Sequence, residues 1–371
     1  MNQVIARLSL VLACGAAALL AAGCGSSEGA PPGAKKLSFE LTDAGCVPNS
    51  TSAPAGPIVF EAENTGTTAV TEIEVMEGDA ILGERENISD GLSGSFSLTL
   101  DKGEYTIYCP GGSDDRGVLT VSGETSAASG ASNASVVSGY RDYLERNTAE
   151  LTSQTKAFVA ALVAGNVARA KSLYGQARIP YERIEPVAEQ FGELDPRIDA
   201  RENDVPAAEF GGFHRLEKAL WVEGDRDPDE TSAIARQLLS DITELEFEVR
   251  TLYLLPLQIV NGANELLGEV SASKITGEEE RYSHIDLVDF EANVEGAEAA
   301  FDAVEPLVED RELVEKVEKG FDDVQAALKP YRRGDGFVPY TELTKADTRK
   351  LAQEIDALAE ELSQVPAQIV G

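Results

Sequence analysis

The stretch YRDYLERNTAELTSQTKAFVAALVAGN, residues 140–166, decides how the second half of the chain folds. Its apolar residues recur at intervals of three and four, which places them on one face of an α-helix. The pattern breaks at Gly165 and Asn166, where the asparagine can cap a following helix. The helical period continues from Val136 onward, so we expect an all-α domain over residues 136–371, large enough for two packed bundles. The further predicted helices span residues 230–265, 286–307, 311–328 and 345–362.

The residues before this stretch follow a different period. Short alternating runs such as PIVFEAEN (57–64), SFSLTL (95–100) and GEYTIYC (103–109) are separated by turn signals. Strands at this spacing predict an all-β sandwich over residues 37–123. Residues 124–135, ETSAASGASNAS, lack apolar periodicity and are predicted to be a linker. The fold class is therefore multidomain, with an all-β sandwich followed by an all-α helical bundle.

The N-terminus predicts export. Residues 8–20 are apolar apart from Ser9, follow Arg7, and form a run too short to span a bilayer. Small residues directly before Cys24 resemble a bacterial lipobox, in which the cysteine is lipidated after cleavage. We expect a signal peptide over 1–23, a tether over 24–36 and a lipid anchor at Cys24; the alternative is an ordinary secretory peptide. Either one places the protein outside the cytoplasm, in the periplasm or on the cell surface.

The charge of the chain excludes nucleic acid as a partner. Lys and Arg number 31 against 65 Asp and Glu, for a formal net charge of −34. Phosphate recognition needs a basic surface, whereas an acidic surface attracts cations. Solubility alone is the alternative explanation for this charge. No run after the signal peptide is long and apolar enough to be a transmembrane helix.

The sandwich contains Cys46 and Cys109, which in an oxidising compartment form a disulfide by default. The sequence GEYTIYCPGG (103–112) resembles a cupredoxin, whose copper site needs two histidines and a cysteine. Residues 25–135 contain no histidine, so that site cannot form. The remaining ligands are the two cysteines with Glu72, which shares a strand face with Glu74 and Met76. Copper held by Cys46, Cys109 and Glu72 and a Cys46–Cys109 disulfide both remain open.

The helical half offers a second candidate metal site. In GGFHRLEKALW (211–221), His214 and Glu217 lie one helical turn apart on one face. An upstream pair with the same spacing, Glu182 and Glu185, precedes Pro186, which leaves the carbonyl of Glu182 without its helical partner. Such pairs converge in metal-binding bundles, and imidazole with carboxylates suits Fe, Mn or Zn. Further candidate ligands are Asp195, Asp199, Asp204, Glu278, Glu279, Glu280, His284, Asp286 and Asp289.

Structural roles are the alternative for two of these candidates. Ser283 can cap a helix whose first turn contains Asp286, where a carboxylate suits the helix dipole. His284 would then have a structural role, as a histidine at the start of that helix.

Four segments, YERIEP, IDARENDV, GFHRLEKALW and EEERYSHIDLVDFEANVEGA, together resemble the imelysin-like family, also called peptidase family M75. The sandwich is similar to the cupredoxin part of its EfeO-type iron-uptake members, and the resemblance covers nearly all of residues 37–371. It implies an extracytoplasmic iron-binding protein that works with an EfeU-like permease and an EfeB-like haem peroxidase. Copper in the sandwich would oxidise Fe(II). The ligands that the resemblance implies for iron are His214, Glu217, Glu182, Glu185, Asp199 and, from the run 278–280, Glu280.

Two other functions stay as alternatives. The family name implies a zinc metallopeptidase around His214 and Glu217. Position 218 is Lys, however, so the inverted motif His-x-x-Glu-His is incomplete, which favours binding over proteolysis. The third possibility is a surface module that binds acidic polysaccharide through a bridging cation.

Overall fold

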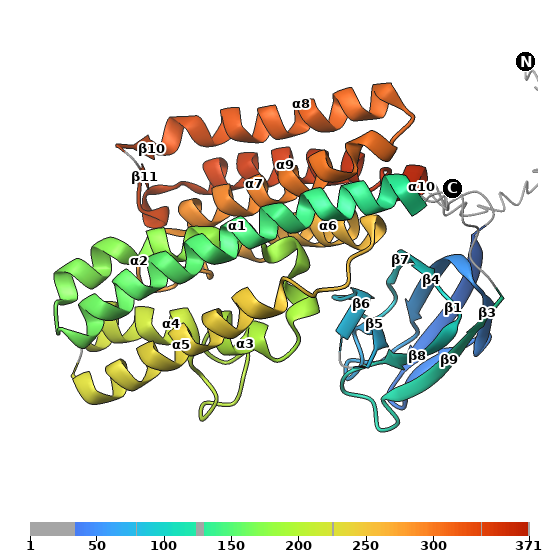
Figure 1. Cartoon of the computed structure of the whole chain (residues 1–371), viewed down its shortest axis with the longest axis horizontal. Helices are drawn as coiled ribbons and strands as arrows, with labels where there is room; N and C mark the ends of the chain where they lie inside the picture. The colour runs from blue at the N-terminus through green and yellow to red at the C-terminus, as the bar shows by residue number, and fades with distance from the viewer. Residues whose placement is uncertain (1–33, 79, 124–129, 225, 335, 370–371) are drawn as a thin grey trace, which may run out of the picture.

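The chain folds into a β-sandwich and a helical domain that lie against each other (Figure 1). The computed structural model describes residues 34–369 except 79, 124–129, 225 and 335. This order of domains confirms the predicted fold class. The predicted signal peptide, the lipidation site Cys24, most of the tether and half of the linker lie outside the described residues. Within the described part, no helix combines the length and the apolar character needed to cross a bilayer.

The sandwich consists of a four-stranded sheet in the order β2-β1-β4-β7 and a five-stranded sheet in the order β3-β9-β8-β5-β6. Alternation along β7 buries Phe96, Leu98 and Leu100 between the sheets, as the sequence predicts. The strands are β1 Lys35–Thr42, β2 Gly45–Pro48, β3 Ser52–Pro54, β4 Gly56–Asn64, β5 Ile73–Glu77, β6 Ala80–Arg85, β7 Ser93–Leu100, β8 Gly103–Tyr108 and β9 Arg116–Ser122.

A disulfide joins the two sheets. Cys46 in β2 is bonded to Cys109, directly after β8, with their Cα atoms 5.9 Å apart. The two cysteines are 63 positions apart in the sequence, and a closed loop of that size stabilises a fold by about 4 kcal/mol in the chain-entropy account. A copper site built on these cysteines needs free thiolates, which the disulfide removes.

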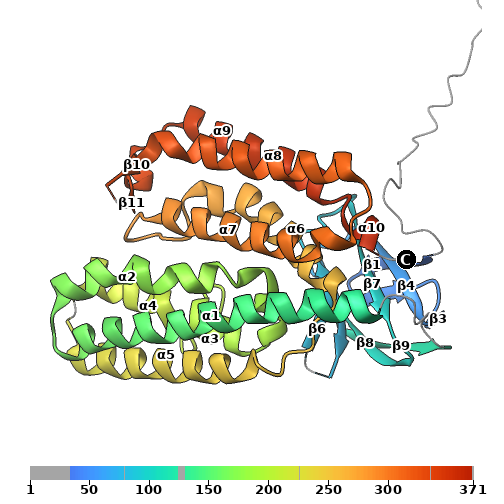
Figure 2. The ribbon, with the colours of Figure 1, turned by 45° about the horizontal axis from the view of Figure 1, so that its top comes forward.

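The helical domain is built of two layers, which Figure 2 shows one above the other. In the first layer α1 packs against α2 and α5; in the second α6 packs against α7 and α9, and α8 against α9. Contact between α2 and α7 joins the layers. The main helices are α1 Gly130–Val163, α2 Val167–Glu182, α3 Leu194–Asp199, α4 Gly212–Lys218, α5 Pro228–Glu248, α6 Pro256–Ala272, α7 Asp286–Val304, α8 Arg311–Leu328, α9 Lys345–Leu362 and α10 Pro366–Ile369. The shorter elements are η2 Glu185–Phe191, η3 Ala219–Glu223, η4 Lys274–Thr276, η5 Glu305–Leu307, η6 Lys329–Tyr331, β10 Arg332–Arg333, β11 Gly336–Phe337 and η7 Tyr340–Glu342.

Two predicted helix boundaries were wrong. The run 230–265 is divided into α5 and α6, because Pro256 lacks an amide hydrogen and therefore begins a new helix. Helix α1 begins at Gly130, within the predicted linker, six positions before Val136. Ala134 and Ser135 are exposed and add nothing to an apolar period, but Ala and Ser still allow an established helix to continue.

Helix α6 holds the two domains together. The side chain of Gln258 donates to the carbonyl of Leu82 at 3.1 Å, and that of Asn261 donates to the carbonyl of Ser97 at 2.6 Å. On the same helix, a Cβ at Gly262 would lie 1.7 Å from the carbonyl oxygen of Pro186, so only glycine lets α6 approach η2 this closely. The sandwich is thereby placed next to the segment that carries Glu182 and Glu185.

Candidate metal centre

A glycine brings the end of α3 and the start of α4 together. Gly212 has φ of 66°, and a Cβ there would lie 2.1 Å from the carbonyl oxygen of Ile198. Only glycine combines this left-handed conformation with such close contact. As a result His214, in the first turn of α4, lies beside Asp199 at the end of α3.

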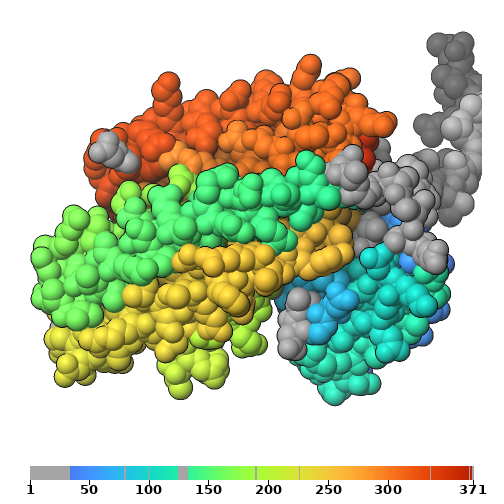
Figure 3. Space-filling model, viewed as in Figure 1, coloured from blue at the N-terminus to red at the C-terminus, as the bar shows by residue number. Residues whose placement is uncertain are grey.

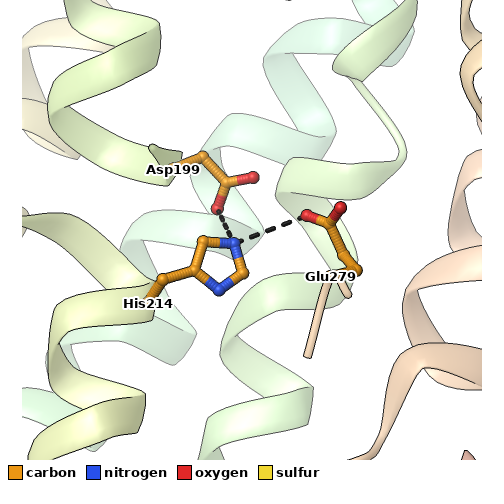
Figure 4. A group of neighbouring side chains, drawn as sticks. All are labelled: Asp199, His214 and Glu279. Carbon is orange, nitrogen blue, oxygen red and sulfur yellow. Dashed lines mark ion pairs between the residues drawn. The ribbon is translucent and has the colours of Figure 1, made fainter. Parts of the chain in front are cut away.

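Asp199, His214 and Glu279 form the core of the candidate centre (Figure 4). The Nε2 atom of His214 is 3.6 Å from Oδ1 of Asp199 and 3.4 Å from Oε1 of Glu279. One ligand atom from each residue lies within 4.8 Å of the others. His214 is only 2% exposed, and neither of its ring nitrogens has a hydrogen-bond partner. Buried polar atoms are normally paired, so an imidazole facing two carboxylates in this way is a suitable ligand set for a cation.

Glu217 lies on the same helix face as His214, as the spacing predicts, but next to the other ring nitrogen. Its Oε1 atom accepts hydrogen bonds from the backbone amides of Tyr282 and Ser283, at 2.8 and 2.6 Å. Its Oε2 atom lies 3.6 Å from Nδ1 of His214, on the far side of the ring from Asp199. At 3.6 Å this contact is an ion pair and not a hydrogen bond. Glu217 is therefore placed to orient the imidazole, as carboxylates behind metal-binding histidines commonly do.

The carboxylates around the ring change its protonation. Burial and the charge of Arg178 lower the pKa of His214, but Asp199, Glu217 and Glu279 outweigh both and raise it to about 9. Burial raises the pKa of Glu279, but the charges of Lys274, His214 and Arg201 bring it well below its ordinary value. At neutral pH the centre therefore contains a protonated imidazole next to ionised Glu279.

Arg178, which the sequence analysis missed, is the fully buried cation behind the centre. It forms ion pairs with Glu182 and Asp199, and its Nε atom is 2.7 Å from Oε1 of Glu280 and 3.2 Å from Oδ2 of Asp289. Its i,i+4 spacing to Glu182 was the only signal in the sequence, and surface pairs commonly have the same spacing.

Glu182 and Glu185 lie beside the centre and contact Lys274 and Asn293 instead of His214. Lys274 forms an ion pair with Glu185 and lies 3.7 Å from Oε2 of Glu182. The side-chain amide of Asn293 donates to the backbone carbonyl of Glu182 at 3.2 Å, which satisfies the group that Pro186 leaves without a helical partner. The same amide donates to the carboxylates of Glu182 and Glu185, at 2.9 and 2.5 Å.

Glu279 takes the place that the sequence analysis gave to Glu280. The carboxylate of Glu280 accepts hydrogen bonds from Tyr174 at 3.1 Å and from Ser283 at 2.5 Å and pairs with Arg178, so it faces away from His214. Ser283 consequently does not cap α7, whose N-cap residue is Ile285. Glu279 and Glu280 precede α7 in an irregular segment, where no period predicts which way a side chain points.

The other predicted ligands have structural partners. Asp195 accepts a hydrogen bond from Tyr181, and Asp204 pairs with Arg201 at 3.0 Å. Asp286 is in the first turn of α7 and accepts from the backbone amide of Glu280 at 3.0 Å. His284 has φ of 60° and forms part of the turn that leads into α7.

A cleft of about 630 Å³ leads from the centre to the sandwich. Asp199 and Glu279 line it at the centre, and Glu84 and Glu86 line it on the sandwich, which Figure 3 shows packed against the helical domain. Acidic residues outnumber basic ones along its walls, so its field favours cations. Its carboxylates are those of Glu84, Glu86, Glu185, Asp195, Asp199, Asp204, Glu265, Glu269 and Glu279, and its cations are Arg85, Arg201 and Lys274.

The sandwich has an acidic cluster of its own. Glu72 lies with Glu74 and Glu84, each offering a ligand atom within 4.8 Å of the others. Burial and neighbouring carboxylates raise the pKa of Glu72 to about 8, and burial raises that of Glu74 to about 7. Among the described residues, neither group of potential cation ligands includes a cysteine. Glu72 therefore lies with other carboxylates, and not in a copper site with Cys46 and Cys109.

The pKa of His214 predicts how cation binding depends on pH. Because a ligating imidazole must be neutral, each bound cation displaces one proton from a group with a pKa of about 9. We expect the affinity for Zn²⁺, measured by competition with a chromophoric chelator, to rise about tenfold per pH unit between about pH 6.5 and 8.5. His214→Gln should bind more weakly and lose this slope; an equal slope in both proteins would contradict the assignment.

The raised pKa also means that protonated His214 stabilises the fold fully below about pH 6.5, a contribution lost as the pH rises through 9.

These features define a class of protein: a β-sandwich joined to a two-layered helical domain, with a buried histidine–carboxylate centre at the end of an acidic cleft. The chain belongs to the imelysin family (peptidase M75), whose profile matches residues 136–365, and a cupredoxin-like domain profile matches residues 13–121. It is similar to proteins named iron uptake system component EfeO from Escherichia coli (strain K12), Shigella flexneri and Shigella sonnei (strain Ss046). Each of them is 41% identical over 341 residues, which are 89% of this chain and 90% of the relative. The resemblance inferred from the four sequence segments is thereby confirmed.

Proposed function

We propose that this protein is the extracytoplasmic iron-binding component of an Efe-type iron-uptake system. Iron binds as cargo to Asp199, His214 and Glu279, with Glu182 and Glu185 at the margin of the site. The acidic cleft concentrates cations, and the bound iron passes to an EfeU-like permease in a system that includes an EfeB-like haem peroxidase. Cys24 anchors the protein to the membrane through lipid.

One observation carries this proposal. His214 is buried, its two ring nitrogens have no hydrogen-bond partner, and it faces two carboxylates that line a cleft of about 630 Å³. A structural histidine would have a partner for at least one nitrogen. The iron-uptake names of the relatives point to iron among the cations that this donor set suits.

The metallopeptidase alternative has less support. A catalytic zinc needs an open coordination position that a peptide bond can reach. Here His214 and Glu279 are only 2% and 4% exposed, and Lys218 stands where the inverted peptidase motif requires a second histidine. We therefore propose cation binding and not peptide hydrolysis.

The test is cation binding by the soluble chain, residues 25–371. Fe²⁺ under anaerobic conditions, Fe³⁺ as a citrate complex and Zn²⁺ are titrated into this protein and into a His214→Ala/Asp199→Asn variant, and retained metal is measured by mass spectrometry. We expect one tightly held iron per chain in the wild type and none in the variant. Equal retention in both proteins, or none in the wild type, would contradict the proposal.

Two further measurements distinguish the alternative functions. Cleavage of denatured proteins that a chelator stops, and that the same variant lacks, would identify a metallopeptidase. Binding of acidic polysaccharide that requires added divalent cation would instead favour a surface module for glycan.

A further inference from the structure

Lys274 is an unusual residue to find beside a cation site. It begins η4, separated from the end of α6 by one residue, and its side chain is only 4% exposed although it lines the cleft. Its ammonium forms an ion pair with Glu185 and lies 3.7 Å from Oε2 of Glu182 and 4.0 Å from Oε2 of Glu279. A buried lysine is retained only where such partners compensate its loss of water.

Lys274 and the candidate centre both contact the carboxylate of Glu279. Glu279 faces the ammonium with Oε2 and the His214 ring with Oε1, at 4.0 and 3.4 Å. A cation bound beside His214 needs the negative charge of the same Glu279 carboxylate, whose Oε2 atom also faces Arg201 at 3.0 Å. Two cations this close in a buried site repel each other strongly, because little solvent screens them. The ammonium and a metal cation therefore compete for this carboxylate.

We propose that Lys274 is a built-in competing cation, which neutralises Glu182, Glu185 and Glu279 in the cation-free protein and swings into the cleft when a metal cation binds. This inference rests on the proposed function, because it concerns the same site. The competition weakens binding, which suits a protein that has to release its cargo.

The cleft provides a place for the displaced ammonium. Glu269 lines the same cleft and is partly exposed. Burial lowers the pKa of Lys274, but the charges of Glu185, Glu279, Glu269 and Glu182 raise it well above its ordinary value. The side chain therefore stays charged and has a carboxylate partner on the cleft side as well as in the centre.

The first test compares the wild type with Lys274→Gln and Lys274→Arg in Mn²⁺ and Zn²⁺ titrations at constant ionic strength. The matched control is Lys319→Gln on α8, whose lysine pairs with Asp323 at the surface. We expect Lys274→Gln to bind at least tenfold more tightly and Lys274→Arg and the control to stay within threefold of the wild type. Unchanged or weaker binding by a folded Lys274→Gln protein would overturn the proposal.

The second test uses the unaltered chain and needs no folded variant. Lysines are acetylated briefly with and without saturating Zn²⁺, and each peptide is quantified by mass spectrometry. We expect labelling of Lys274 to rise several-fold with Zn²⁺ and labelling of Lys319 to stay constant. Unchanged labelling of Lys274 would mean that it is not displaced and would overturn the inference.

The two proposals fail in different ways. If the wild type binds metal and Lys274→Gln binds no more tightly, only the role of Lys274 is refuted. If the wild type binds nothing and Lys274→Gln binds metal, the competition is supported and delivery of iron by this site is refuted. If neither protein binds metal, both proposals fall.

Discussion

Glu279→Gln should lower the affinity for iron or Zn²⁺ by at least about 100-fold, equivalent to about 2.7 kcal/mol. The substitution keeps the shape of the side chain and removes the negative charge that faces His214 at 3.4 Å. A carboxylate ligand in a site with little solvent supplies much of the attraction for a cation, and an amide oxygen replaces it poorly. The measurement is a competition titration with a chromophoric chelator at pH 7.5.

The neighbouring residue supplies the matched control. Glu278 belongs to the same acidic run, but its side chain is 44% exposed and its nearest basic group, on Arg201, is 4.0 Å away. Glu278→Gln makes the same change in net charge and should alter the affinity less than twofold. If the two variants weaken binding equally, the general acidity of the cleft holds the cation, and the centre around His214 does not.

Arg178→Met should lower the free energy of unfolding of the helical domain by about 3–5 kcal/mol. Arg178 is fully buried and pairs with Glu182, Asp199, Glu280 and Asp289. Removing it leaves the carboxylates of Glu182 and Asp199 without their compensating charge. The measurement is urea unfolding followed by circular dichroism at 222 nm, which reports on the helices.

The control for this prediction lies five positions further along the chain, directly after the end of α2. Arg183 is 30% exposed at its side chain and pairs with Glu295 at 2.7 Å. Partly exposed pairs of this kind contribute roughly 0–1 kcal/mol, so Arg183→Met should have a small effect. A loss below about 1 kcal/mol for Arg178→Met would mean that the carboxylates around it are neutral in the native state, and that the electrostatic description of the centre is incorrect.

The sequence was informative wherever a regular period connects a residue to its neighbours. Helices α8 and α9 follow the predicted bounds because their apolar residues alternate with charged ones at helical spacing. The same reasoning correctly placed His214 and Glu217 within one helical turn. It did not reveal that Glu217 lies behind the ring, because that depends on the backbone amides of Tyr282 and Ser283, which are distant in the sequence.

The residues that the sequence analysis missed lie where no period exists or where a common pattern hides an uncommon role. Glu279 and Glu280 precede α7 in an irregular turn, so the choice between them depends on tertiary packing. Lys274 follows the end of α6, where a lysine usually faces solvent, and only the fold shows that it is buried. The i,i+4 spacing of Arg178 and Glu182 is typical of an ion pair on a helix surface. Arg178 is nevertheless buried, because α2 packs against α7.

The disulfide gives the two domains different requirements for maturation. Cys46 and Cys109 pair only under oxidising conditions, whereas residues 136–371 contain no cysteine at all. The helices and the histidine–carboxylate centre therefore need no oxidation step, whereas the sandwich lacks its cross-link until the thiols are oxidised. The sandwich, which contributes one wall of the cleft, gains the stabilisation of the cross-link only after the thiols are oxidised. Reductant should thus lower the stability of the sandwich and leave that of the helical domain unchanged.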